Sequence, residues 1–190
     1  MPGGGSVAAH AGALAAALAQ MVAGLTVGKK KYAAVDVEMK DVAQSAAALG
    51  NELAALVKRD ADAYASVSDA YKLPKEPADA AAKRAEAVTK ALLGAAEVPI
   101  ETATAAVEVA KLALAVAERG NTNAVTDAGV AALLAHAAAK GAAYNVRVNV
   151  MALEDRGRGE GLLTRAEKLV EESAELAAKT EAAVERSLGV

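Results

Sequence analysis

The stretch SVAAHAGALAAALAQMVAGLTV, residues 6–27, carries no Asp, Glu, Lys or Arg. It is rich in alanine, the best helix former. Its larger apolar residues recur at helical spacing: Val7, Leu14, Leu18, Met21, Val22 and Leu25. Ser6 is a good N-cap, and Gly28 with the three lysines after it is typical of a helix end. The stretch therefore predicts one long helix.

The same stretch is also long enough to cross a bilayer. It consists mostly of Ala and Gly, which gain little from lipid, and it contains His10 and Gln20. No basic residue precedes it, which is unlike a signal peptide. We therefore interpret it as a helix buried on most sides inside a bundle or a dimer, and we expect no membrane partner.

The rest of the chain also carries residues that are typical of helix starts and ends. Further helices are predicted at about 36–71, 78–119, 125–153 and 162–188. The prolines at 74 and 77 mark a loop, Pro99 should kink or divide the third helix, and Gly120 is a natural stop. Strand alternation is not evident. The sequence predicts a single all-α domain over residues 1–190, a bundle of long antiparallel helices.

Composition excludes several classes of site. The chain has no cysteine, which rules out disulfides, thiolate metal sites and a cysteine nucleophile, and suits the cytoplasm. With only His10 and His136, a histidine-rich metal site is not expected. The net charge is -3 and aromatics make up 2%, so neither a basic face nor base stacking supports nucleic-acid binding.

Two aspartates interrupt the second predicted helix. Asp60 and Asp62 follow an apolar pair, and Asp62 shares one helical face with Ser66 and Asp69. One interpretation is a solvated face on which Asp62 pairs with Lys58, one turn earlier. The other is a carboxylate that faces a cleft and acts as acid and base.

Asparagines form a second set of candidates. Asn123 and Asp127 are i,i+4 partners, and Asn145 and Asn149 repeat that spacing beside an apolar stripe. An asparagine in that setting needs hydrogen-bond partners, which neighbouring helices or helix ends can supply. The alternative is recognition of a heterocycle rich in donors and acceptors.

Glycines and lysines form a third set. Gly3, Gly4, Gly5 and Ser6 resemble an anion cradle at a helix N-terminus, although close backbone packing explains the glycines equally well. One interpretation of the lysines at 29, 30 and 31 is a solvated helix end. The other is a cationic segment that attracts a carboxylate-rich ligand tail.

Several short motifs occur together in one order. They are PGGGSVAA (2–9), MV (21–22), LTVGKKKY (25–32), DADAY (60–64), AYKLPK (70–75), VP (98–99), GNTN (120–123), DAGVA (127–131), NV (145–146) and VN (148–149). This set, covering about residues 2–155, resembles the cyclodeaminase domain of formiminotransferase-cyclodeaminase. It is still more similar to the single-domain bacterial methenyltetrahydrofolate cyclohydrolases of that family.

The resemblance implies an all-helical homodimer with folate bound near the subunit interface. It implies that Asp62, the second aspartate of Asp-x-Asp, is the catalytic acid and base. The implied substrate-binding residues are Gly3, Gly4, Gly5, Ser6, Lys29, Lys30, Lys31, Asn121, Asn123, Asp127, Asn145 and Asn149.

The expected activity is hydrolysis of 5,10-methenyltetrahydrofolate, with the lysines holding a glutamate tail. Formiminotetrahydrofolate cyclodeamination and a non-catalytic helical scaffold are the alternatives. We expect no metal and no cofactor beyond the tetrahydrofolate substrate.

Overall fold

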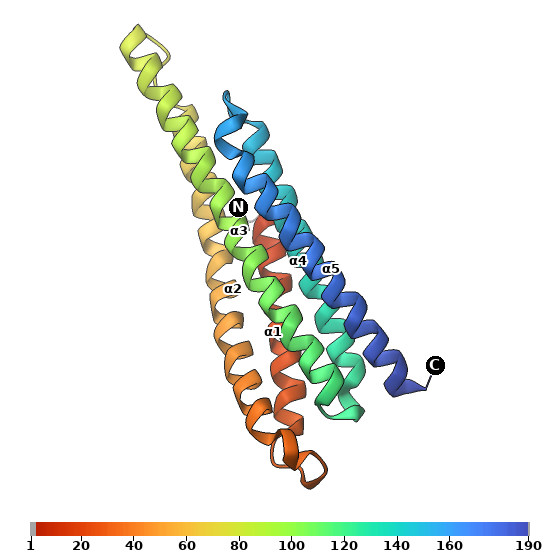
Figure 1. Ribbon diagram of the computed structural model, residues 1–190. Helices are drawn as coiled ribbons and strands as arrows, with labels where there is room; N and C mark the ends of the chain where they lie inside the picture. The colour runs from red at the N-terminus through yellow and green to blue at the C-terminus, as the bar shows by residue number, and fades with distance from the viewer. Residues whose placement is uncertain (1–2, 190) are drawn as a thin grey trace.

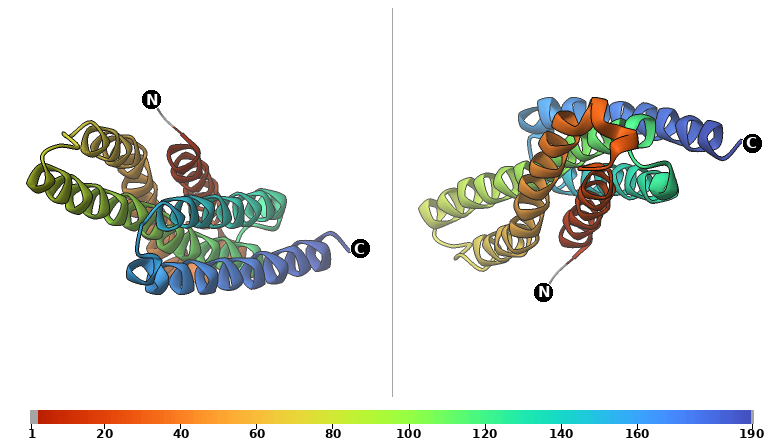
Figure 2. Two further views of the ribbon diagram at one scale, coloured as in Figure 1. Left: turned by 90° about the horizontal axis from the view of Figure 1, so that it is seen from above. Right: turned by 90° about the horizontal axis from the view of Figure 1, so that it is seen from below.

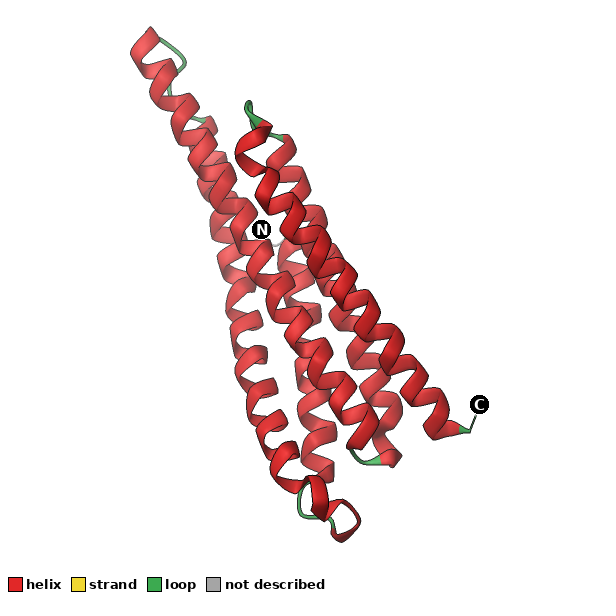
Figure 3. Cartoon of the chain, in the orientation of Figure 1, coloured by secondary structure: helices red, strands yellow, loops and turns green. Residues whose placement is uncertain are grey.

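The computed structural model describes residues 3–189, so Pro2 of the glycine-rich motif lies outside the described residues. Every regular element in that range is helical, which confirms the all-α prediction (Figure 3). The elements are α1 (Gly4–Thr26), η1 (Lys30–Val35), α2 (Asp36–Tyr71), α3 (Ala78–Arg119), η2 (Thr122–Ala124), α4 (Val125–Met151), η3 (Arg156–Gly159) and α5 (Glu160–Leu188).

Short connections make each long helix run antiparallel to the one before it (Figure 1). α1 packs against α2, α3 and α4, whereas α5 packs against α3 and α4. The end views place α1 on the side of the bundle away from α5 (Figure 2). By length and composition α1 could cross a membrane, but in this bundle it packs extensively against α2 and α4.

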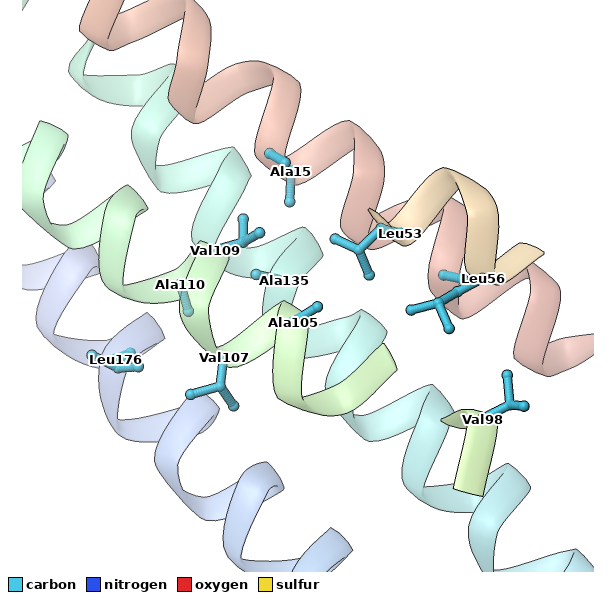
Figure 4. Close-up of a cluster of buried hydrophobic side chains, with 12 residues drawn as sticks. Ala15, Leu53, Leu56, Val98, Ala105, Val107, Val109, Ala110, Ala135 and Leu176 are labelled. Carbon is cyan, nitrogen blue, oxygen red and sulfur yellow. The ribbon is translucent and has the colours of Figure 1, made fainter. Parts of the chain in front are cut away.

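Small side chains build the core. The cluster in Figure 4 takes residues from all five long helices: Ala15, Leu53, Val109, Ala135 and Leu176. Alanine at most buried positions of α1 and α4 lets the helix axes approach closely. At Gly12 an added Cβ would lie 3.0 Å from the Leu53 side chain, so glycine there allows a close α1–α2 approach.

Helix lengths differ, and this difference leaves a fork at one end of the bundle. α1 has 23 residues, α2 has 36 and α3 has 42. At about 1.5 Å per residue, α1 is about 20 Å shorter than α2. The α2–α3 hairpin and the α4–α5 hairpin therefore separate beyond the N-terminal end of α1 (Figure 1).

Two local predictions are corrected. Ser6 is not the N-cap of α1: Gly3 takes that position, because the helix begins at Gly4 and the Ser6 hydroxyl is used elsewhere. Pro99 does not divide the third helix, which continues through it from Ala78 to Arg119. The remaining predicted helices lie within two residues of the observed ones, with α4 ending at Met151 and α5 beginning at Glu160.

Candidate active site

A cavity of about 420 Å³ occupies the base of the fork. The first residues of α1 form its floor, α2 and α3 form one wall, and the last turns of α4 form the other. Its lining residues are Gly3, Gly4, Asp60, Tyr64, Val67, Tyr71, Leu92, Ala95, Asn145, Val148, Asn149 and Ala152. The cavity is therefore an apolar pocket with a few convergent polar groups, the usual form of a small-molecule site.

Asp60 is the carboxylate of this cavity. The Ser6 hydroxyl donates to Asp60 Oδ2 over 2.7 Å, from the first turn of α1 to α2. A Cβ added at Gly5 would overlap the Asp60 carboxylate, so glycine at this position allows the close approach. The N-terminal end of a helix carries partial positive charge, which stabilises an anion there. The predicted anion cradle is thus filled by a carboxylate of the chain itself.

Asp62 does not line this cavity, and its catalytic role stays a prediction. Its side chain is 62% exposed and forms an ion pair with Lys58 Nζ at 2.5 Å, as in the solvated-face interpretation. Two residues along a helix turn the side chain by about 200°, so Asp60 and Asp62 point to opposite sides of α2. The cavity contains the first aspartate of Asp-x-Asp instead of the second.

Asn145 and Asn149 both line the cavity. Asn145 Nδ2 donates to the Gly141 carbonyl over 2.8 Å. Asn149 Nδ2 donates to the carbonyls of Asn145 and Ala95, each over 2.9 Å. The bond to Ala95 joins α4 to α3, so the interhelical interpretation also holds. Both N–H donors of Asn149 are engaged in this way, so it offers its Oδ1 acceptor to a ligand, whereas Asn145 keeps its Oδ1 and one N–H.

Two tyrosines in the cavity were missed by the sequence reasoning. Tyr64 and Tyr71 lie on the face of α2 that also carries Asp60 and the buried Val67. A signal was available, since positions 60, 64, 67 and 71 repeat at helical spacing. Both rings are largely exposed, and the Arg84 guanidinium lies 5.6 Å from the centre of the Tyr71 ring. The outer wall is thus aromatic, with a cation at its end.

The remaining predicted residues lie at the opposite end of α1. Lys29, Lys30 and Lys31 follow its C-terminal end, about 35 Å from Gly4 at 1.5 Å per residue. Lys31 Nζ donates to Thr122 Oγ1 over 3.3 Å, which places the lysines beside the α3–α4 connection. Within one chain the predicted site therefore forms two separate groups.

Asn121 at that second group has a structural role. Its backbone N–H donates to Thr26 Oγ1 over 2.8 Å, and its Nδ2 donates to the Leu25 carbonyl over 3.1 Å. Its Oδ1 accepts from the backbone N–H of Asn123 over 3.1 Å. Asn121 therefore caps η2 and closes the end of α1, while the Asn123 side chain is exposed and Asp127 half-buried.

Tyr32 anchors the lysine segment to the same connection. Its hydroxyl accepts from the Thr122 N–H over 3.0 Å. The hydrogen bonds from Thr122, together with the nearby Lys31 ammonium, lower the pKa of Tyr32 to about 8. This end of the molecule is thus organised and cationic.

Comparison with known proteins gives concordant results. The sequence profile of the formiminotransferase-cyclodeaminase family matches residues 1–184. The chain is 42% identical to a methenyltetrahydrofolate cyclohydrolase of Methylorubrum extorquens, over 92% of this chain and 84% of that protein. It is 34% identical to the formimidoyltransferase-cyclodeaminase of Mus musculus over 96% of this chain, and it spans 33% of that longer protein.

The fold agrees with a solved relative. The crystal structure of formiminotetrahydrofolate cyclodeaminase from Thermotoga maritima superposes with a TM-score of 0.88 at 29% identity, covering 98% of this chain and 89% of that one. Sequence and fold agree along nearly the whole length, and the chain belongs to the formiminotransferase-cyclodeaminase family.

Proposed function

We propose that the cavity binds a tetrahydrofolate derivative and that the chain is a methenyltetrahydrofolate cyclohydrolase, which converts 5,10-methenyltetrahydrofolate to 10-formyltetrahydrofolate. The observation that carries this proposal is a carboxylate, Asp60, that is held by the Ser6 hydroxyl and lines an apolar cavity together with Asn145 and Asn149. The 42% identity to a cyclohydrolase over 92% of the chain supports the reaction.

The polarity of the cavity suits this ligand. Its polar side chains include three acceptor groups: the Asp60 carboxylate and the Oδ1 atoms of Asn145 and Asn149. The methenyl carbon lies between two nitrogens and forms an amidinium-like cation, while the reduced pterin ring carries N–H donors. A carboxylate in an apolar cavity stabilises such a cation electrostatically.

Asp60 performs both proton transfers in this mechanism. It takes a proton from water as the water oxygen attacks the methenyl carbon. When the bond from that carbon to N5 breaks, Asp60 returns the proton to N5. The second proton of the water leaves to solvent as the formyl C=O forms. Ser6 holds the carboxylate in place throughout through its hydroxyl.

We further propose that the working form is a homodimer through α1. Four large apolar side chains of this helix stay exposed in one chain: Val7 at 65%, Leu14 at 49%, Met21 at 41% and Leu25 at 45%. With Ala11 and Leu18 they form a stripe that alternates four- and three-residue steps. In an antiparallel pair of α1 helices, Val7 meets Leu25, Ala11 meets Met21 and Leu14 meets Leu18.

Charge favours the antiparallel pairing over the parallel one. A parallel pair would bring the two Lys29–Lys31 segments together, which costs repulsion. The antiparallel pair instead places each segment beside the Asp60 cavity of the other copy. A face about 35 Å long and three helices wide, about 25 Å at 8–10 Å between axes, has an area of about 850 Å². A stable interface needs about 800 Å² per partner.

This dimer would reunite the two groups of predicted site residues. The lysines of one copy would then receive the glutamate tail of a folate bound in the cavity of the other. Three ammonium groups concentrate an anionic tail even on a chain with a net charge of -3. The proposed setting is the cytoplasm, consistent with a cysteine-free chain.

Cyclodeamination is the second candidate, favoured by the TM-score of 0.88 to a formiminotetrahydrofolate cyclodeaminase. There N10 would attack the formimino carbon, Asp60 would move a proton to the leaving nitrogen, and ammonia would depart. The deciding experiment offers the purified protein each substrate and follows the absorbance of methenyl-folate. Loss of absorbance supports the cyclohydrolase, formation from formimino-folate supports the cyclodeaminase, and no change with either contradicts both.

A further inference from the structure

Pro99 lies inside the unbroken helix α3 and leaves one carbonyl without its normal helical partner. Proline has no N–H, so the i−4 carbonyl, that of Ala95, receives no bond from position 99. Asn149 on α4 supplies the missing donor, with its Nδ2 at 2.9 Å from the Ala95 oxygen. This bond is how α4 compensates the proline that was expected to kink or divide the helix.

The same bond determines how Asn149 faces the cavity. A side-chain amide has two N–H donors, and those of Asn149 go to the carbonyls of Ala95 and Asn145. Its Oδ1 has no protein partner, yet among the described residues no buried side-chain nitrogen or oxygen lacks one, so this oxygen is accessible. Since Asn149 and Ala95 both line the cavity, the accessible oxygen belongs to the ligand space.

We propose that Pro99 is a positioning residue that fixes the hydrogen-bond polarity of the ligand site. By withholding a donor from the Ala95 carbonyl, it keeps the amide nitrogen of Asn149 on α3 and presents Oδ1 to the ligand. The site then selects a ligand edge that carries an N–H or amino donor at this point, and it rejects an acceptor. The identification of this ligand edge as part of a reduced pterin rests on the proposed function. The hydrogen-bond polarity of the site does not depend on that function.

Asn145 is an internal control for Asn149. Its Nδ2 bonds the Gly141 carbonyl of its own helix, so its orientation does not depend on Pro99. Substituting each asparagine by leucine, which has similar shape and no polar atoms, separates the two cases. Asn149→Leu leaves the Ala95 carbonyl without a donor only while residue 99 is proline. In Pro99→Ala, the new backbone N–H bonds that carbonyl instead.

The first test compares the Tm values of single and double variants of the substrate-free protein, so it requires no enzymatic activity. We expect Asn149→Leu to lower Tm by several degrees more in the wild-type background than in Pro99→Ala, and Asn145→Leu to lower it equally in both. Equal losses for Asn149→Leu in the two backgrounds would overturn the proposal. Pro99→Ala introduces a good helix former into a helix, so the background variant should fold.

The second test measures polarity through kinetics. In Pro99→Ala the Ala95 carbonyl no longer needs the Asn149 amide, which is then held only by its bond to the Asn145 carbonyl. KM for methenyl-folate should therefore rise about 3- to 10-fold, the value of one hydrogen bond, with kcat within about twofold. Pro99→Gly, which also restores an N–H, should show the same rise in KM. An unchanged KM in both variants would refute the polarity argument. If no folate substrate turns over in the wild type, the proposed function fails while the comparison of Tm values still decides the Pro99–Asn149 coupling.

Discussion

Replacing Asp60 by asparagine is the most direct test of the site. The substitution keeps the size of the side chain and keeps an oxygen that accepts from the Ser6 hydroxyl, whose donor distance to Asp60 is 2.7 Å. It removes the base that takes a proton from water in the proposed mechanism. General acid–base catalysis contributes about 10²–10⁴-fold, so kcat should fall by that factor, or about 3–5.5 kcal/mol of barrier.

Stability should change far less than turnover. The bond from Ser6 changes from a charge-assisted to a neutral one, and the anion at the N-terminus of α1 is lost, which together cost about 1–2 kcal/mol. For a chain of this size, that corresponds to a Tm decrease of about 2–8 °C. The Asp60→Asn variant should therefore remain folded, and product binding should persist at a measurable affinity.

The matched control is Asp62→Asn. Asp62 is exposed and pairs only with Lys58, so its loss should leave kcat within about twofold and Tm nearly unchanged. The assay is the initial rate of methenyl-folate absorbance loss, with a correction for its spontaneous hydrolysis. Near-normal turnover in Asp60→Asn would refute the reasoning, and a large loss in Asp62→Asn instead would return the catalytic role to the second aspartate.

Three further outcomes follow from the same structure. Leu14→Glu should convert the dimer to a monomer in light scattering, whereas Leu133→Glu, on the α4 face away from the stripe, should not; a wild-type monomer at micromolar concentration would contradict the dimer. Neutralising Lys29, Lys30 and Lys31 to Gln should raise KM more for polyglutamylated than for monoglutamylated folate, while the same change at Lys168 and Lys179 of α5 should affect neither; equal effects on both substrates count against a tail site. Gly5→Ala should lower kcat at least tenfold through displacement of the Asp60 carboxylate, and a variant with unchanged kcat would show that the close approach is dispensable.

The helices of this chain were predictable because their signals are local. Periodicity, prolines and glycines set the ends of α1, α2 and α3 to within about two residues. Pro99 was the exception, since its effect depends on a side chain 50 positions farther along the chain, and no local pattern reveals that Asn149 lies beside Ala95.

The candidate site was predictable only in part. Asn145 and Asn149 were singled out because polar residues beside an apolar stripe need partners, and both line the cavity. Motif matching selected the second aspartate, Asp62. The helical phase of Tyr64, Val67 and Tyr71 instead marks Asp60 as the aspartate that lines the cavity. The family resemblance placed the lysines and the glycines in one site. In the structure the length of α1 separates the two groups.

The distal arm of the fork and its base also differ in how readily they open. From Tyr71 to Ala91 no residue is buried, so the distal arm of the α2–α3 hairpin has little packing to resist transient opening. The floor of the cavity, by contrast, rests on the part of the bundle where α1 touches three other helices. Amide exchange in the arm should therefore be fast and uncoupled from global unfolding. A wall that yields while the floor stays fixed allows the site to admit and release a bulky ligand without moving its carboxylate.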